Sequence, residues 1–169
     1  MPVYIWSDLH LGHTNIIGYE NRPFKDIDEM DKFIISNWRK HITRKDKIIN
    51  LGDVSLGYSK ERLTKLISNL PGHKILILGN YDRGKSLKGW YDVGFNEVYR
   101  YPIIWDNFYI LSHEPVYINT YMPYVNIHGH THGKSSDNKQ KVNVSVEVLN
   151  YKPILFDDIM NKFNLEKRK

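Results

Sequence analysis

Short apolar runs in the first half of the chain alternate with segments in which apolar residues have helical spacing. The runs Val3–Trp6, Lys47–Leu51 and Lys74–Leu78 each stop at a polar cluster, as buried strands do. Between them, apolar side chains recur at helical spacing after two N-capping residues, Asp26 and Ser59. This β-α-β-α-β order predicts a parallel sheet with right-handed crossovers.

Both predicted helices have start and stop signals of their own. Glu29 follows Asp26 by three residues, as in a capping box, so we expect a helix from Ile27 to about His41. The second helix begins after Ser59 and ends at Pro71-Gly72.

The second half of the chain is dominated by strand-like segments. They cover Phe95 to Tyr101, Phe108 to Ser112, Tyr124 to His128 and Lys141 to Val148. Valines alternate strictly in the last of them, as in a half-buried strand, and a final helix is expected over Phe156 to Phe163. We therefore predict an α/β fold, a four-layer α-β-β-α sandwich of two mixed sheets flanked by helices.

The composition fits one globular domain of ordinary chemistry. Among the 169 residues there is no cysteine, which excludes disulfides, thiol nucleophiles and cysteine zinc sites. We expect a single domain over residues 1–165 and a basic C-terminal tail over 166–169. Without a signal peptide pattern or an apolar run of the roughly 18 residues that span a bilayer, we expect a soluble protein with no membrane partner.

The formal net charge of +5 makes anionic partners plausible without requiring them. Lysines and arginines form no dense stripe, so nucleic acid is allowed as a partner but is not favoured. Frequent Ile, Lys, Asn and Tyr residues fit an AT-rich bacterial or phage genome. We therefore expect the protein in the cytoplasm of a bacterium or of a phage-infected host cell, with its oligomeric state left open.

Polar side chains gather where the predicted strands end. Because ligands in open α/β sheets bind outside the carboxyl ends of strands, we expect these side chains to meet at one edge. They come from five separate segments, which are Asp8 with His10, Asp53, Asn80 with Asp82, His113, and His130 with His132.

Carboxylate, amide and imidazole donors without sulfur suit Mn²⁺, Fe²⁺, Ni²⁺ or Zn²⁺. The set offers at least seven candidate ligands, whereas a tetrahedral zinc needs only about four. We therefore predict two divalent ions, Mn²⁺ first among them, with one carboxylate between them at the roughly 3.5–4 Å spacing of two-metal sites. Gly52, Gly79 and Gly129 each precede a candidate ligand and permit close backbone approach.

Five motifs, taken in order, resemble those of the calcineurin-like metallophosphoesterases. They run through nearly the whole chain and read Asp8-Leu9-His10, Gly52-Asp53, Gly79-Asn80-Tyr81-Asp82, Ser112-His113 and Gly129-His130-Thr131-His132. The first motif continues as Leu11 to Ile17 and then Asn21 to Phe24, which resembles a small bacterial and phage branch of the family.

The resemblance implies a metallo-dependent phosphatase-like sandwich and a specific ligand set. One ion would be held by Asp8, His10, Asp53 and His132. The other would be held by Asp53, Asn80, His113 and His130, so that Asp53 bridges the two.

Tyr81 departs from the family pattern, because many members carry a histidine there that assists the leaving group. A tyrosine hydroxyl is a poor general acid at neutral pH. His13, just past the first ligands, and Arg22, which could contact phosphate in a bidentate way, are candidate substitutes. Asp82 is expected to orient a ligand.

These residues predict a metal-dependent phosphoester hydrolase in which two ions activate a water as nucleophile. We expect a phosphodiesterase acting on a small nucleotide or similar diester, since a diester leaving group is expelled more easily without a dedicated acid. The alternatives are a phosphomonoesterase of the same fold, a metal-bound binding module without catalysis, and a nucleic-acid-binding protein.

Overall fold

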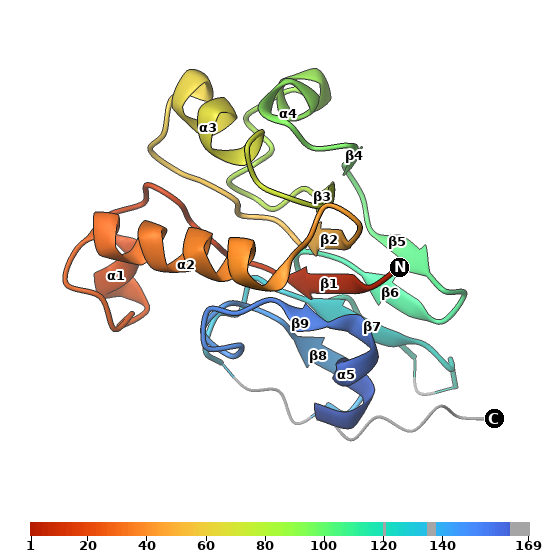
Figure 1. The fold of residues 1–169 in the computed structure, drawn as a ribbon. Helices are drawn as coiled ribbons and strands as arrows, with labels where there is room; N and C mark the ends of the chain where they lie inside the picture. Colours follow the sequence, from red (N-terminus) through yellow and green to blue (C-terminus); the bar gives the residue numbers. More distant parts are fainter. Residues whose placement is uncertain (120, 135–137, 163–169) are drawn as a thin grey trace.

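The strands of the computed structural model form two β-sheets in the described residues, 1–119, 121–134 and 138–162 (Figure 1). The five-stranded sheet has the order β4 (Glu97–Tyr99), β3 (His73–Ile77), β2 (Lys47–Asn50), β1 (Val3–Trp6) and β9 (Ile154–Leu155). The four-stranded sheet has the order β5 (Ile103–Trp105), β6 (Tyr109–Leu111), β7 (Val125–His128) and β8 (Lys141–Asn143).

Both sheets are mixed, as predicted. In the larger sheet β1, β2, β3 and β4 run parallel, with Ile5 opposite Ile49 and Ile49 opposite Ile75, while β9 joins β1 antiparallel. In the smaller sheet β6, β7 and β8 run parallel and β5 is antiparallel to β6. Because β1 to β4 are parallel, their carboxyl ends lie at one edge of the larger sheet, and the carboxyl ends of β6 to β8 likewise lie at one edge of the smaller sheet.

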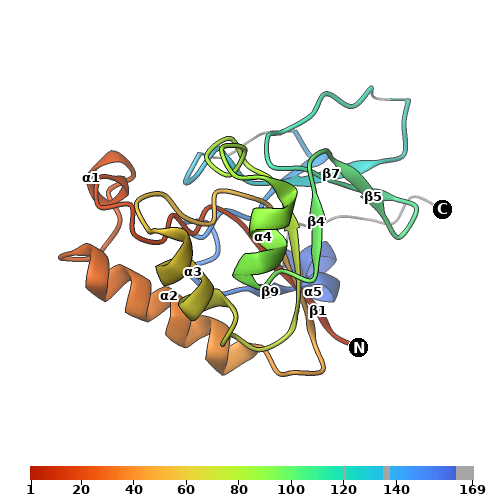
Figure 2. The ribbon, with the colours of Figure 1, turned by 90° about the horizontal axis from the view of Figure 1, so that it is seen from above.

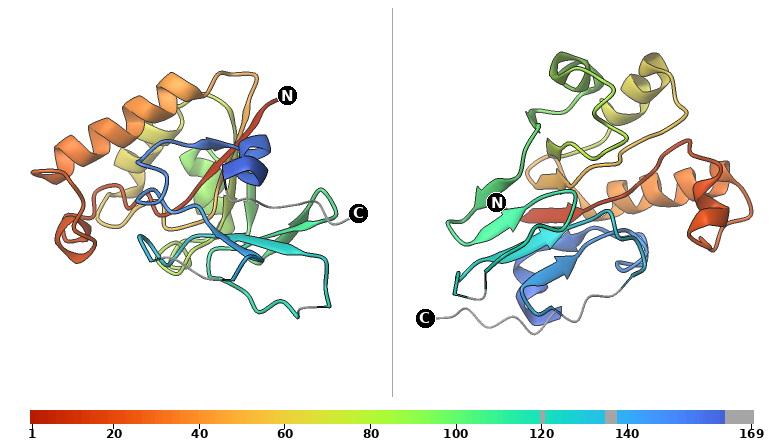
Figure 3. Two further views of the ribbon diagram at one scale, coloured as in Figure 1. Left: turned by 90° about the horizontal axis from the view of Figure 1, so that it is seen from below. Right: turned by 180° about the vertical axis from the view of Figure 1, so that it is seen from behind.

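Helices flank this pair of sheets. Their bounds are α1 (Ile16–Tyr19), α2 (Ile27–His41), α3 (Lys60–Ile67), α4 (Leu87–Val93) and α5 (Phe156–Lys162). Helices α2, α3 and α4 lie on one side of the five-stranded sheet and the four-stranded sheet lies on the other (Figures 2 and 3). Helix α5 contacts β1 and β9, and its Phe156 packs edge-on against Tyr109 of β6. The predicted α/β sandwich is confirmed.

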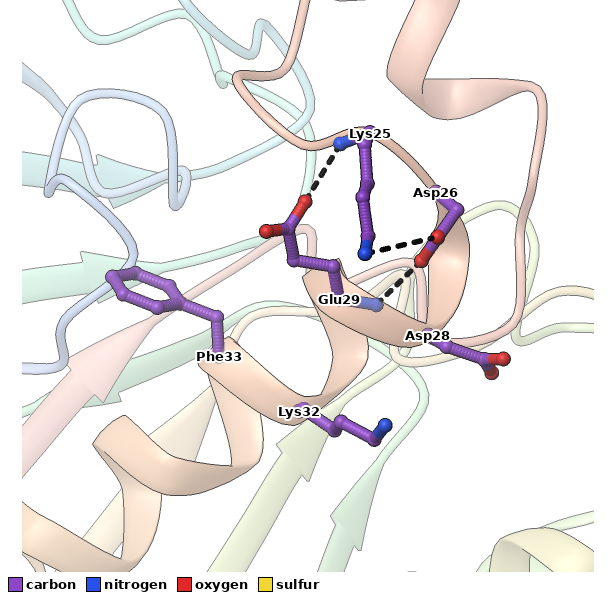
Figure 4. Close-up of a pocket in the computed structure, with 6 residues that line it drawn as sticks. All are labelled: Lys25, Asp26, Asp28, Glu29, Lys32 and Phe33. Carbon is purple, nitrogen blue, oxygen red and sulfur yellow. Dashed lines mark hydrogen bonds and ion pairs between the residues drawn. The ribbon is translucent and has the colours of Figure 1, made fainter.

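Helix α2 begins as its sequence predicts. The Asp26 carboxylate accepts a hydrogen bond from Glu29 N at 2.8 Å, and the Glu29 carboxylate accepts one from Lys25 N at 2.8 Å (Figure 4). The glutamate thus reaches one residue further back than in a standard capping box. The surface hollow beside this cap contains none of the predicted site residues.

Two tryptophans fix β1 against α2. Trp6 and Trp38 are fully buried, and their rings meet edge to face with centroids 5.4 Å apart. Such aromatic pairs add to the stabilisation that burial alone provides. The end of β1, from which Asp8 and His10 follow, is therefore anchored by the core.

The predicted strand from Lys141 to Val148 is too long, because β8 ends at Asn143. The Asn143 side-chain oxygen accepts hydrogen bonds from both the backbone and the hydroxyl of Ser145, and the chain turns there. Ser145 then makes an isolated bridge to Ser7, next to the end of β1. The valine alternation therefore reflects burial in a turn rather than a continuous strand.

Four short elements were not predicted from the sequence: α1, α4, β5 and β9. Helix α4 had readable signals, since Ser86 caps it by accepting from Gly89 N and Gly94 ends it at φ +117°. The final helix begins at Phe156 as expected. Phe163 and the predicted 166–169 tail lie outside the described residues.

Among the residues described, no helix has both the length and the apolar character needed to cross a bilayer.

Replacing the α2 cap, Asp26→Ala, should lower the free energy of unfolding by about 1 kcal/mol, because Glu29 N loses its acceptor. Urea unfolding would measure this. Asp28→Ala is the control, since Asp28 is exposed in the same first turn and points away from the cap (Figure 4). An equal loss in both variants would contradict a specific capping role.

Candidate metal centre

All seven predicted ligands lie beyond the carboxyl ends of strands, and both sheets contribute to them. The five-stranded sheet supplies Asp8 and His10 after β1, Asp53 after β2 and Asn80 after β3. The four-stranded sheet supplies His113 after β6, and His130 and His132 after β7.

Their donor atoms form two clusters. In the first cluster, Asp8, His10 and His132 each offer one atom, and these three atoms lie within 4.8 Å of one another. Asp53, His113 and His130 form the second cluster by the same measure. The structure thus separates the side chains into two groups with the chemistry that divalent cations need.

Asn80 belongs to the second cluster. Its side-chain oxygen lies 2.9 Å from His113 Nε2 and 3.1 Å from His130 Nδ1. The other nitrogen of His113, Nδ1, lies 2.7 Å from the Leu51 carbonyl oxygen, to which it can donate. That hydrogen bond leaves His113 Nε2 as the nitrogen that faces the cluster.

One oxygen of Asp53 lies between the two clusters. Asp53 Oδ2 is 3.6 Å from His10 Nε2 and 3.4 Å from His113 Nε2. The other oxygen, Oδ1, accepts a hydrogen bond from Tyr81 N at 3.0 Å, which fixes the orientation of the carboxylate. This is the position that a bridging carboxylate would occupy.

The first cluster contains buried atoms without a hydrogen-bonding partner. Asp8 Oδ2 accepts from Ser145 Oγ and from His130 N, each at 2.9 Å, but Asp8 Oδ1 and His10 Nε2 have none. These two atoms are 3.9 Å apart. An unpaired buried polar group costs about 1–3 kcal/mol. A cation between them would satisfy both atoms, so the residues present fit a metal ion.

Burial favours the uncharged forms of both Asp8 and His10 in the first cluster. It raises the pKa of Asp8 and lowers the pKa of His10 to about 3, because charge is disfavoured away from water. Burial also acts against the charged form of Asp53, but the hydrogen bond and charge of His113 hold the pKa of Asp53 below its usual value. A neutral His10 keeps a nitrogen lone pair available to a cation.

The backbone is left-handed at five of the seven candidate ligands. Their φ angles lie between 49° and 65°, at Asp8, His10, Asp53, His130 and His132. Such angles are uncommon for residues other than glycine. Backbone hydrogen bonds hold them, including Asp8 N to Gly52 O at 3.0 Å and His10 N to Asp53 O at 2.9 Å.

Glycine is required beside the ligands for reasons of space. A Cβ atom on Gly129 would overlap Ser7 Oγ and Asp8 Oδ2, and one on Gly79 would overlap Asp53 Oδ1. The predicted close approach of the backbone is therefore present at both positions.

Tyr81 and His13 line the side of the first cluster. The Tyr81 ring is 43% exposed, and its centroid lies 5.4 Å from that of His10 and 5.8 Å from that of His13. His13 Nδ1 lies 3.2 Å from His10 Nδ1, so one of the two nitrogens donates to the other. Tyr81 is therefore exposed beside the first cluster, whereas His13 is buried at 8% exposure.

Asp82 supports the loops instead of facing the clusters. It is fully buried, and its carboxylate accepts from Asp53 N at 2.7 Å, Gly79 N at 2.9 Å and Val54 N at 3.1 Å. Burial, together with the charge of Asp53, raises the pKa of Asp82 to about 6. Asp82 thus holds the backbone that presents Asp53 and Asn80.

Arg22 does not match the expected contact with phosphate. Its side chain has no exposed surface, and the guanidinium donates to the carbonyl oxygens of Asp8 at 2.7 Å and Leu9 at 3.0 Å. It also pairs with Glu147, a residue that the sequence reasoning missed. Every contact of Arg22 points into the protein, so its place is behind the ligands.

Gly129→Ala should lower the free energy of unfolding by about 1–3 kcal/mol, because overpacking displaces Ser7 and Asp8. Chemical denaturation would measure the loss. Gly84→Ala is the matched control, since no atom lies within 4 Å of its added Cβ, and it should change stability by less than about 0.5 kcal/mol. Equal stability of the two variants would refute the steric requirement.

Comparison with known proteins places this geometry in a family. The family model for calcineurin-like phosphoesterases matches residues 1–168. An uncharacterized protein of Methanocaldococcus jannaschii is 36% identical over 170 residues, which cover 94% of this chain and 89% of that protein. The gene 66 protein of Mycobacterium phage L5 is 38% identical over 78 residues, covering 45% of this chain and 37% of the phage protein.

A solved structure has a similar fold over almost its whole length. The crystal structure of a protein of unknown function from Aquifex aeolicus superimposes with a TM-score of 0.72 at 25% identity, and the match covers 95% of this chain and 98% of that one. The family match spans the described fold and every candidate ligand. The chain therefore belongs to the calcineurin-like phosphoesterase family.

Proposed function

We propose that this chain is a two-metal phosphodiesterase that acts on small nucleotide diesters, with Mn²⁺ as its preferred ion. The observation that carries the proposal is the position of Asp53 Oδ2, between His10 of one donor cluster and His113 of the other. Two-metal hydrolytic sites use a shared ligand of this kind.

The proposed ligands divide as the two clusters do. Asp8, His10 and His132 would hold one ion, Asn80, His113 and His130 the other, and Asp53 both. When bound, the two ions would neutralise phosphoryl charge and lower the pKa of a water molecule. The protein holds these donors in place through the hydrogen bonds that Asp8 Oδ2 and Asp53 Oδ1 accept and the one that His113 Nδ1 donates to the Leu51 carbonyl oxygen.

The preference for diesters rests on the group beside the first cluster. Tyr81 stands there with its ring against His10 and His13, and a tyrosine hydroxyl donates a hydrogen bond more readily than a proton at neutral pH. Arg22 is buried behind the ligands and is not available as a substitute. A substrate whose leaving group departs without strong acid assistance suits this arrangement.

Exposed aromatic rings next to the first cluster favour a nucleotide. Tyr19 is 70% exposed and Tyr81 is 43% exposed, and the His13 ring lies between them, 6.2 Å from Tyr19 and 5.8 Å from Tyr81. Aromatic side chains of this kind stack on nucleobases, at about 1–3 kcal/mol per base. A nucleoside attached to the phosphate could stack on the exposed ring of Tyr19 or Tyr81.

Protein loaded with Mn²⁺ should hydrolyse bis(p-nitrophenyl) phosphate with a higher kcat/KM than p-nitrophenyl phosphate. Asp53→Asn should reduce both activities to background, because an amide provides one oxygen and no charge for bridging. Absorbance of the released p-nitrophenolate measures the rates, and circular dichroism checks that the variant is folded.

Two outcomes would count against the proposal. Faster cleavage of the monoester would favour a phosphomonoesterase of the same fold. Folded protein with bound metal that cleaves neither ester would favour a binding module without catalysis.

The nucleotide preference can be tested separately with two diesters that share a leaving group. Thymidine 5′-(p-nitrophenyl phosphate) should be cleaved with a higher kcat/KM than methyl p-nitrophenyl phosphate. Tyr19→Ala should lower kcat/KM about 5-fold or more for the thymidine ester only, through the loss of stacking, whereas Tyr19→Phe should retain it. Tyr91→Ala, at an exposed tyrosine on α4, is the control. Equal rates for the two esters in the parent protein would refute the preference.

A further inference from the structure

We propose that Glu147 and Arg22 are positioning residues for the first donor cluster, Asp8, His10 and His132. The inference rests on the proposed metal site, and it assigns a role to a buried ion pair in which Glu147 lies outside the sequence motifs. The pair connects the first motif of the chain to the last one.

Glu147 fixes the orientation of His132. Glu147 Oε1 lies 2.9 Å from His132 Nδ1, while His132 Nε2 faces Asp8 Oδ1 at 3.9 Å. A carboxylate that accepts the Nδ1 hydrogen leaves the lone pair of Nε2 free for a cation. The same hydrogen bond prevents rotation of the ring away from the cluster.

Arg22 fixes the other side of the cluster. Its Nε and one terminal nitrogen lie 2.9 and 2.7 Å from Glu147 Oε1, and the guanidinium donates to the carbonyl oxygens of Asp8 and Leu9. These carbonyls belong to the turn in which Asp8 and His10 are both left-handed. Arg22 therefore holds a strained turn by its backbone and the His132 ring through Glu147.

The second cluster is held differently, which makes the role of the pair testable. His113 Nδ1 faces a backbone carbonyl, that of Leu51, at 2.7 Å. A change at Glu147 should therefore weaken one of two cation sites and leave the other unaltered. A purely structural ion pair would not distinguish between them.

The test measures Mn²⁺ binding by isothermal titration calorimetry, independently of activity, in the parent and in Glu147→Gln and Glu147→Asp. We expect the affinity of one of the two ions to fall about 10- to 100-fold, as for other groups that support a metal-bound histidine. The affinity of the other ion should change less than about threefold, because changes at sites that share no contacts are usually independent of each other. Glu97→Gln is the matched control, because Glu97 of β4 also pairs with a histidine, its Oε1 lying 2.7 Å from Nε2 of His73 in β3, and neither residue belongs to a donor cluster.

The two Glu147 variants separate positioning from folding. Glu147→Gln leaves the buried Arg22 charge unpaired, which can unfold a protein, whereas Glu147→Asp keeps the charge but shortens the reach to His132. Wild-type affinity at both sites in a folded variant would overturn the inference. So would a loss of stability in both variants with no selective effect on one ion. Parent protein that binds two Mn²⁺ ions but cleaves no ester would refute the proposed function alone.

Discussion

Left-handed backbone at five of the candidate ligand positions is the constraint on which the rest of the centre depends. Each such residue outside glycine is held at a cost of about 1–3 kcal/mol, and five of them meet at one edge. The cost is offset because each turn is bonded to another: Asp8 N to Gly52 O, His10 N to Asp53 O and His130 N to Asp8 Oδ2. No turn is supported only by its own segment, so the loops are expected to keep or lose their conformation together.

Charge imposes a second condition on the same loops. Three carboxylates, Asp8, Asp53 and Asp82, are buried close to one another. Asp82 is compensated by three backbone N–H groups and Asp53 by His113, whereas one oxygen of Asp8 has no partner. The protein therefore leaves one buried carboxylate oxygen of the centre without a hydrogen-bond partner, and a bound cation would satisfy that oxygen.

Local signals predicted what local interactions determine. The β1, β2 and β3 strands, the α2 helix with its Asp26 cap and the seven candidate ligands at strand ends could all be read from the sequence. Features that depend on distant contacts could not. The turn after Asn143 exists because Ser145 bonds to Asn143 and Asp8, and valine alternation carries no trace of that. Likewise, the direction of the Arg22 side chain follows from Glu147, which lies 125 residues further along the chain.

Each donor cluster takes side chains from both sheets, and this has a consequence for synthesis of the protein. Of the four histidines in the predicted ligand set, three lie at residue 113 or later, and only His10 lies near the start of the chain. The Asp8 carboxylate also accepts a hydrogen bond from Ser145, which is synthesised 137 residues later. A nascent chain emerging from the ribosome would carry the carboxylates first and most of the nitrogen donors last. In the proposed two-metal site, the binding of ions would therefore have to follow synthesis of the chain through Ser145, and each ion would link early and late segments of the chain.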